Sequence, residues 1–244
     1  MPVEIRDLLV LREGFPAVDR VTLTLEEGLW TGVVGANGSG KTSLLRALGG
    51  RIEAQAGSIV VDGEERLADR AWRARAFGFS PDATSLPDTL TGRELFSILA
   101  SDAPGVADAD PLSPLRRALG FDSFIDRRIG TLSAGMRQRL AIFCAFLERP
   151  RLVVLDEPFN WLDPICAFDT REALKALVAG EKLTLVTALH EMATLTGHCD
   201  RGLLLSQGKV GLELSSSELR AGARDYPAFE ARLIGLLRSA GAAH

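Results

Sequence analysis

Residues 35–42 read Gly35-Ala-Asn-Gly-Ser-Gly-Lys41-Thr42 and match the pattern G-x-x-x-x-G-K-[ST]. An apolar run at 29–34 precedes this loop, and a helical pattern at 43–48 follows it. Glycines let backbone N–H groups converge on phosphate oxygens, and a helix start favours negative charge. The order strand, glycine loop, helix therefore predicts a phosphate site in an α/β core. An ordinary glycine-rich turn with an exposed lysine is the alternative, but it does not account for this context.

Each residue type in the loop has a role in phosphate chemistry. The lysine places a positive charge between β- and γ-phosphates, and the threonine hydroxyl is a ligand for Mg²⁺. The residues expected to hold the nucleotide are Gly35, Asn37, Gly38, Ser39, Gly40, Lys41, Thr42 and Ser43.

A second buried strand is predicted at 152–155, and it ends in two acids, Asp156 and Glu157. Open α/β sheets bind ligands at the carboxyl ends of their strands, so Asp156 is expected to hold Mg²⁺ directly or through water. Strand alternation predicts that Glu157 points away from Asp156 and can orient the water that attacks the γ-phosphate. Acids after strands are often helix caps, so this pair alone would be weak evidence. Together with the phosphate loop, it indicates a catalytic site.

The remaining apolar patterns predict an α/β fold, with a P-loop nucleoside-triphosphatase core and a mainly parallel sheet. Alternating apolar residues at 18–26 and a short strand at 57–63 indicate an N-terminal antiparallel β subdomain. Continuous apolar runs are typical of strands buried in parallel sheets, and they occur at 152–155, 183–186 and 203–205.

We expect one domain over residues 1–244. The segment at about 83–131 has short helical patterns at 92–100 and 112–119 and no strong strand, which predicts an inserted helical subdomain. The tail at about 217–244 has an amphipathic helical pattern.

Composition narrows the classes of partner. The chain has 28 basic and 32 acidic residues, a net charge of −4, so we expect no nucleic-acid partner. The longest apolar run, at 140–147, is far shorter than the roughly 20 residues of a membrane-spanning helix. Three isolated cysteines, Cys144, Cys166 and Cys199, fit free thiols in a reducing compartment, and we expect a cytoplasmic protein.

A second candidate phosphate contact precedes the apolar run at 140–147, which predicts a helix over those residues. It reads Thr131-Leu-Ser-Ala-Gly-Met-Arg-Gln-Arg139. A serine followed closely by glycine at a helix start can hold phosphate. On this segment alone, an ordinary helix N-cap is an open alternative.

Taken in order, these motifs resemble those of the ATP-binding subunits of ABC transporters. The phosphate loop is followed by a signature, Leu132-Ser-Ala-Gly-Met136, and by the acidic strand. A D-loop, Asn160-Trp-Leu-Asp163, and a switch histidine, His190, come next. The resemblance runs from about residue 3 to 214.

The resemblance implies ATP and Mg²⁺ as ligands and a second ATP-binding domain, identical or different, paired head to tail. The signature residues Ser133, Ala134, Gly135 and Met136 would then contact ATP held by the opposite subunit. Asp163 would lie at the dimer interface. Glu157 and His190 would be catalytic, with His190 contacting the γ-phosphate and helping to position the water. The implied function is ATP hydrolysis that drives transport by a separate integral-membrane subunit, which would hold this chain at the inner membrane face.

Some positions depart from the family pattern. Asp82 stands where the aligned loop usually ends in glutamine, and it can still meet Mg²⁺ or the attacking water. An acid at this place, and the run Met-Arg-Gln-Arg from Met136, resemble exporter-type subunits and favour export. Phe15 is the candidate for stacking on adenine, with a core or turn role as the open alternative. Trp161 replaces a small D-loop residue and is expected either at the dimer interface or in a surface groove.

Two other functions use a similar core. A soluble ABC-type ATPase that acts as an assembly factor or clamp is the alternative to transport. Repair-type clamps have a long coiled coil between the phosphate loop and the signature, whereas this chain has about 90 residues there without heptads. A P-loop kinase would have an acceptor lid and no signature segment.

Overall fold

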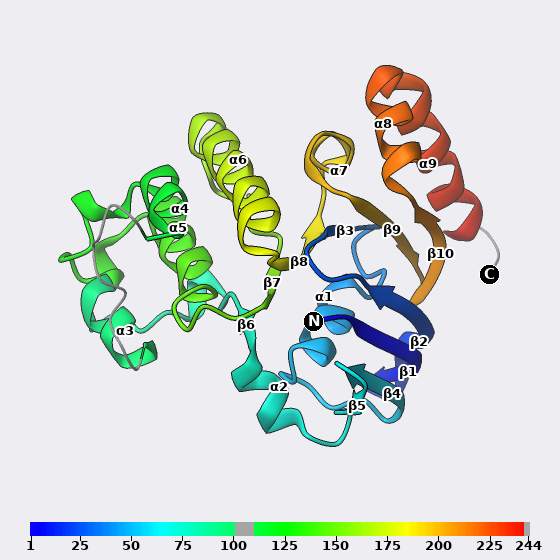
Figure 1. Ribbon diagram of the computed structural model, residues 1–244, viewed down its shortest axis with the longest axis horizontal. Helices are drawn as coiled ribbons and strands as arrows, with labels where there is room; N and C mark the ends of the chain where they lie inside the picture. Colours follow the sequence, from blue (N-terminus) through cyan, green and yellow to red (C-terminus); the bar gives the residue numbers. More distant parts are fainter. Residues whose placement is uncertain (101–109, 242–244) are drawn as a thin grey trace.

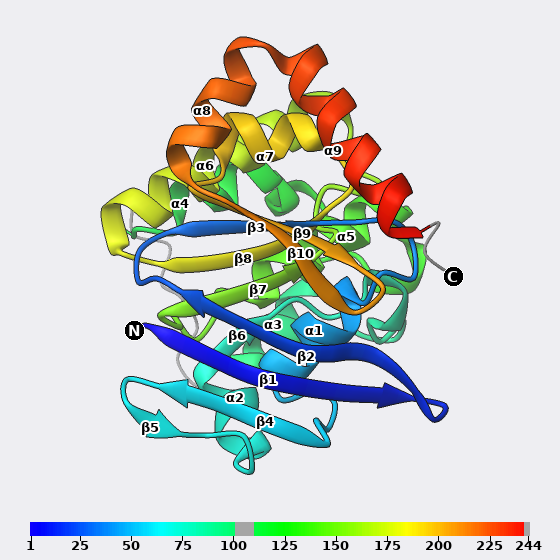
Figure 2. The ribbon, with the colours of Figure 1, turned by 90° about the vertical axis from the view of Figure 1, so that its right-hand side faces the viewer.

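Two β-sheets enclose helix α1 (Lys41–Leu48), which follows the phosphate loop (Figure 2). The structure is a computed structural model, and it describes residues 1–100 and 110–241. The buried side chains of α1 pack against apolar residues of both sheets, so the helix lies in a core between them. The position of the loop in front of α1 is therefore set by both sheets.

The larger sheet has six strands in the order β10-β9-β3-β8-β7-β6. All neighbouring pairs are parallel except β9 with β10. The strands are β3 (Trp30–Val34), β6 (Phe77–Phe79), β7 (Leu152–Asp156), β8 (Thr184–Leu189), β9 (Arg201–Ser206) and β10 (Lys209–Leu214). Strands β3 and β8 are buried along their whole length, including their threonines Thr31, Thr184 and Thr187, as is typical of strands inside a parallel sheet.

The smaller sheet is antiparallel, with the order β2-β1-β4-β5. Its strands are β1 (Val3–Arg12), β2 (Phe15–Leu25), β4 (Ala56–Val61) and β5 (Glu64–Glu65). Together the two sheets confirm the predicted fold class, an α/β core with a mainly parallel sheet and an N-terminal antiparallel sheet. The sequence patterns did not predict β1, β5, β6 or β10.

Helices α3 (Gly92–Leu99), α4 (Ser113–Leu119) and α5 (Ala134–Cys144) lie together at the end of the molecule away from the antiparallel sheet (Figure 1). Short 3₁₀ turns at Ala83–Ser85, Phe121–Ser123 and Ile129–Thr131 connect this region. The rings of Phe96, Phe121 and Phe143 pack with centroids 4.8–5.4 Å apart. Residues 101–109 of the predicted helical subdomain lie outside the described residues.

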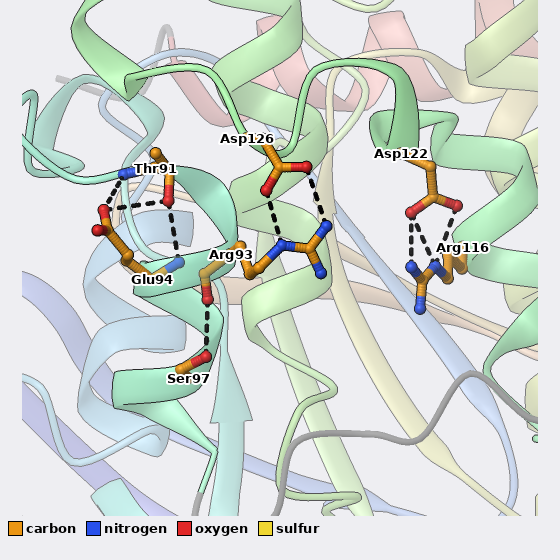
Figure 3. Close-up of polar contacts among 7 residues, drawn as sticks. All are labelled: Thr91, Arg93, Glu94, Ser97, Arg116, Asp122 and Asp126. Carbon is orange, nitrogen blue, oxygen red and sulfur yellow. Dashed lines mark hydrogen bonds and ion pairs between the residues drawn. The ribbon is translucent and has the colours of Figure 1, made fainter.

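Polar contacts at the surface of this region set its local geometry (Figure 3). Thr91 and Glu94 form a capping box that begins α3, because each side chain accepts from the other's backbone N–H. Arg93 pairs with Asp126 at 2.7 Å, and Arg116 pairs with Asp122 at 2.7 Å.

One predicted boundary is wrong. The apolar run at 140–147 is not a helix of its own, since α5 begins at Ala134 and ends at Cys144. Residues 145–147 are buried in a turn that leads to β7. Apolar burial alone does not require helical backbone, which explains the error.

Further helices cover the face of the larger sheet opposite α1 (Figure 2). They are α6 (Pro164–Glu181), α7 (Met192–His198), α8 (Ser216–Arg224) and α9 (Tyr226–Gly241). Helices α8 and α9 lie in the predicted tail, and residues 242–244 are outside the described residues. Among the described residues, no helix combines the length and apolarity needed to cross a lipid bilayer.

A fully buried arginine fixes the far end of α1. Arg73, on helix α2 (Arg70–Ala76), is 0% exposed and donates to the backbone carbonyls of Leu48 and Ala47 at 3.2 and 3.3 Å. It also donates to the carbonyls of Arg66 and Leu67. Burial lowers the pKa of this guanidinium, and the carbonyls satisfy its donors. Arg73 thereby caps the helix whose other end forms the phosphate loop.

Candidate functional site

The phosphate loop is closely bounded by backbone from two other strands. A Cβ at Gly35 would lie 2.2 Å from the carbonyl oxygen of Leu205 in β9. A Cβ at Gly40 would lie 2.1 Å from the carbonyl oxygen of Ala17 in β2, and Gly40 has a φ of 102°. Only glycine fits both positions, and the loop therefore has one tightly defined path.

Two side chains in the loop fit phosphate binding. Lys41 is 5% exposed, and its Nζ donates to the carbonyls of Gly35 at 2.9 Å and Ala36 at 3.2 Å. Burial lowers its pKa, while nearby Glu157 and Asp156 act in the opposite direction. The buried hydroxyl of Ser39 has no hydrogen-bond partner within the described part of the chain, so it can donate to a ligand oxygen.

Oxygen ligands suited to Mg²⁺ lie beside the loop. The Thr42 hydroxyl donates to Oδ1 of Asp156 at 3.2 Å, and burial raises the pKa of that carboxyl. A bound cation would offset this burial. No group of three or more histidine, cysteine, aspartate or glutamate side chains forms a metal cage within residues 1–100 and 110–241. One carboxylate and one hydroxyl suit Mg²⁺, which usually takes its other ligands from water and substrate phosphates.

Asp82 lines a cavity together with Thr42 and Asp156, but one of its carboxylate oxygens is already hydrogen-bonded to Thr84. Its Oδ1 accepts from the backbone N–H and the hydroxyl of Thr84, at 2.8 and 2.7 Å, and begins a 3₁₀ turn. These hydrogen bonds lower the pKa of Asp82. The cavity, of about 250 Å³, is lined by Asp82, Thr42, Asp156 and Glu157 among others.

The second acid, Glu157, is held by two side chains. Its Oε1 lies 2.7 Å from Nε2 of His190, which follows β8, and its Oε2 accepts from Nδ2 of Asn160 at 2.9 Å. The expectation that strand alternation directs Glu157 is wrong. Strand β7 ends at Asp156, and Glu157 has a φ of 51°, in the left-handed region. Its direction therefore comes from the turn that follows the strand.

The signature segment begins α5 as an N-cap. The Ser133 hydroxyl accepts from the backbone N–H of Met136 at 3.3 Å, and Ser133 and Ala134 are exposed. A Cβ at Gly135 would lie 2.5 Å from the carbonyl oxygen of Trp161. The N-cap reading is therefore correct for Ser133, and an exposed N-cap at a helix start leaves room for an anion.

The D-loop contacts α5 within the same chain. Asp163 begins α6 by accepting from the backbone N–H of Cys166 at 2.9 Å, and it pairs with Arg139 at 2.7 Å. The side chain of Trp161 is 74% exposed and lines the cavity, so it fills no groove of its own chain.

Phe15 is 77% exposed at the start of β2, which excludes a core role. It lies two residues before Ala17, whose carbonyl bounds the phosphate loop.

The structure thus brings Thr42, Asp82, Asp156 and Glu157 to one cavity, and His190 joins them through Glu157. Ser133, Ala134 and Phe15 do not line that cavity. Asn160 and Gln138 also line the cavity. The sequence analysis named Asn160 only as the first residue of the D-loop and did not name Gln138, which lies in α5 with no local pattern that marks it.

Comparison with known proteins gives consistent matches. A family model described as "ABC transporter" matches residues 18–160. An uncharacterized ABC transporter ATP-binding protein, YdbJ of Bacillus subtilis, is 33% identical over 80% of this chain and 63% of its own length. The phosphonates import ATP-binding protein PhnC of Agrobacterium fabrum is 32% identical over 85% of this chain and 77% of its own. A dimeric bacterial ABC transporter cassette superposes with a TM-score of 0.76 at 22% identity, over 88% and 98% of the two chains.

The glycine geometry predicts unequal effects of two alanine substitutions. Both Gly38 and Gly40 have positive φ, but a Cβ at Gly38 meets nothing within 4 Å. Gly38→Ala should cost about 1–2 kcal/mol through backbone strain alone, which lowers Tm by a few degrees. Gly40→Ala adds the clash with Ala17 and should lower Tm by at least twice as much. Thermal denaturation without nucleotide measures both, and equal shifts would contradict the packing described here.

Proposed function

The chain belongs to the ABC transporter family as an ATP-binding ATPase subunit, and we propose the following roles for its residues. The observation that carries the proposal is that two pairs of side chains lie next to each other at one cavity. Thr42 with Asp156 lies at the end of the phosphate loop, and Glu157 with His190 lies beside it. One pair suits a cation on the phosphates, and the other suits activation of water.

Nucleotide binding rests on the loop and its lysine. The backbone N–H groups of residues 35–43 and the Lys41 ammonium would hold the phosphates. Thr42 and Asp156 would hold Mg²⁺, with Asp82 as a further candidate ligand, and the ion supplies charge neutralisation on the phosphates when bound. Phe15, exposed near the loop, would stack on adenine.

Hydrolysis rests on the carboxylate of Glu157. Glu157 would accept a proton from the water that attacks the γ-phosphate. His190 holds Oε1 of that carboxylate and would also reach the γ-phosphate. The Lys41 charge would stabilise negative charge as it develops on the transferred group.

A second ATP-binding domain would complete the site. Head-to-tail pairing would place the signature residues Ser133, Ala134, Gly135 and Met136 on the partner's ATP, with Asp163 at the interface. The exposure of Ser133, Ala134 and Asp163 supports this role. So does the fold shared with a bacterial cassette that forms a dimer.

An integral-membrane subunit would dock on a groove between α3 and the larger sheet. The groove has a volume of about 890 Å³, and its lining combines apolar side chains such as Phe79, Leu86 and Leu99 with charged ones. The charged residues are Arg46, Arg51, Arg75, Asp82 and Glu148. Leu99 is 44% exposed. A groove of this size with an apolar part suits a short amphipathic helix of a partner protein. Such docking would place the chain on the cytoplasmic face of the membrane.

Export is the proposed direction of transport. Asp82 and the segment from Met136 to Arg139 resemble exporter-type subunits, whereas the relative PhnC is named for import. The complete transporter sets the direction of transport, because this chain would supply ATP hydrolysis to an exporter and to an importer alike.

The base assignment predicts a separation of binding from hydrolysis. Glu157→Gln should reduce the hydrolysis rate about 100-fold or more, since an amide cannot accept the proton. ATP binding should persist, and an ATP-bound dimer should accumulate in size-exclusion chromatography. Lys41→Ala is the contrasting variant, which should weaken nucleotide binding itself. Hydrolysis by Glu157→Gln within a few-fold of the unaltered chain would show the assignment to be wrong.

The docking groove predicts a change in membrane attachment. Leu99→Glu should move the chain from the membrane fraction to the soluble fraction, because it replaces an apolar side chain of the proposed contact with a charge that docking would bury. ATP affinity should stay unchanged. Leu236→Glu, a charge on the exposed face of α9, is the control and should remain with the membrane. A fully active soluble complex without any integral-membrane protein would instead support the assembly-factor or clamp function.

The direction of transport is measured with the membrane subunit in inside-out vesicles. Export predicts that external ATP drives substrate into the vesicle lumen, and that Lys41→Ala abolishes this accumulation. ATP-driven loss of preloaded substrate from the same vesicles would establish import.

A further inference from the structure

We infer that Asn160 is a positioning residue for hydrolysis, and that its side-chain amide sets the orientation of the Glu157 carboxylate. The inference rests on the proposed role of Glu157 as the base. Its basis is the contact of Nδ2 of Asn160 with Oε2 of Glu157, at 2.9 Å.

The direction of the Glu157 side chain depends on the conformation of the turn after β7. Glu157 has a left-handed φ of 51°, which a residue with a side chain adopts only when its surroundings require it. The backbone N–H of Asn160 donates to the carbonyl of Glu157 at 3.3 Å and closes a turn. Asn160 thus contacts Glu157 through both its backbone and its side chain.

The two side-chain partners of Glu157 act on different oxygens. His190 lies on Oε1 at 2.7 Å, and Asn160 lies on Oε2. Two contacts fix the plane of a carboxylate, whereas one contact leaves it free to rotate. A carboxylate accepts about four hydrogen bonds, so positions remain for the attacking water. The amide carries no charge and therefore orients the carboxylate without neutralising it.

Helix α5 braces the turn on both sides of Asn160. Gln138, which is 8% exposed, donates to the carbonyl of Pro158 at 3.1 Å. Arg139 pairs with Asp163 at 2.7 Å. These contacts hold the segment from Pro158 to Asp163 against the start of the signature helix. The position of the Asn160 amide, and with it the orientation of the base, therefore depends on α5.

Because of its location, Asn160 can be substituted to test its effect on hydrolysis separately from any effect on folding. The residue is exposed at the cavity, so its side chain contributes little to the packed core. A truncation there should leave the fold intact, and kinetics should report on orientation alone.

The experiment compares Asn160→Ala, Asn160→Asp and the unaltered chain in steady-state and single-turnover ATP hydrolysis. Asn160→Ala should lower kcat by about 10- to 100-fold, the size of effect expected from a misplaced catalytic group. KM, ATP affinity and Tm should change by little, because the phosphate loop is untouched. Gln55→Ala is the matched control. It removes a side-chain amide whose oxygen accepts from the Leu11 backbone at 2.6 Å, away from the cavity, and should keep kcat unchanged.

The separate effects on kcat and KM distinguish orientation from a general structural effect. Asn160→Asp replaces the donating amide with a carboxylate, which cannot donate to Oε2 of Glu157 and repels it. This variant should therefore lower kcat at least as much as Asn160→Ala, with KM and Tm unchanged. A merely structural role would change KM or Tm together with kcat.

Two results would overturn the inference. One is a kcat of Asn160→Ala within twofold of the unaltered chain, and the other is a kcat of Asn160→Asp within twofold of it. Failure of the underlying proposal looks different, since Glu157→Gln would then hydrolyse ATP at nearly the normal rate whatever Asn160 does.

Discussion

The close approach of three backbone segments at the phosphate loop is the constraint on which the rest of the structure depends. The loop passes between the carbonyls of Ala17 in β2 and Leu205 in β9, with no space for a Cβ at Gly40 or Gly35. These contacts join the antiparallel sheet to the parallel one. Helix α1 is consequently buried between the sheets, and its second residue, Thr42, lines the cavity that holds the acids.

The site is completed by loops that follow neighbouring strands. Strand β7 delivers Asp156 and Glu157, and β8 delivers His190, because adjacent parallel strands end at the same edge of the sheet. The turn after β7 then contacts α5 through Gln138 and Arg139. The residues proposed for phosphate, water and the signature therefore form one connected region, although they lie far apart in sequence.

The similarity to relatives assigns the chain to its family, but Asp82 and Trp161 depart from the family pattern. Asp82 caps a 3₁₀ turn with one oxygen while it lines the cavity, and Trp161 stands exposed where the family has a small residue. Both positions lie at surfaces where the proposed partners would meet the chain. The buried guanidinium of Arg73 serves a different end, since it fixes the C-terminus of α1 through backbone carbonyls alone.

Local patterns in the sequence determined the phosphate loop, the acidic strand end and the α/β class. Each depends on neighbours in the chain, such as a glycine loop before a helix or an apolar run before two acids. Only the tertiary structure decided how Glu157 points. Strand alternation failed there because the strand ends one residue earlier and the left-handed turn redirects the side chain. The contacts of His190 with Glu157, and of Arg73 with α1, were likewise not predicted. They depend on side chains that meet across separate elements, and no spacing along the chain encodes those distances. The contact of Asn160 with Glu157 lies within the turn after β7, and it depends on the conformation of that turn.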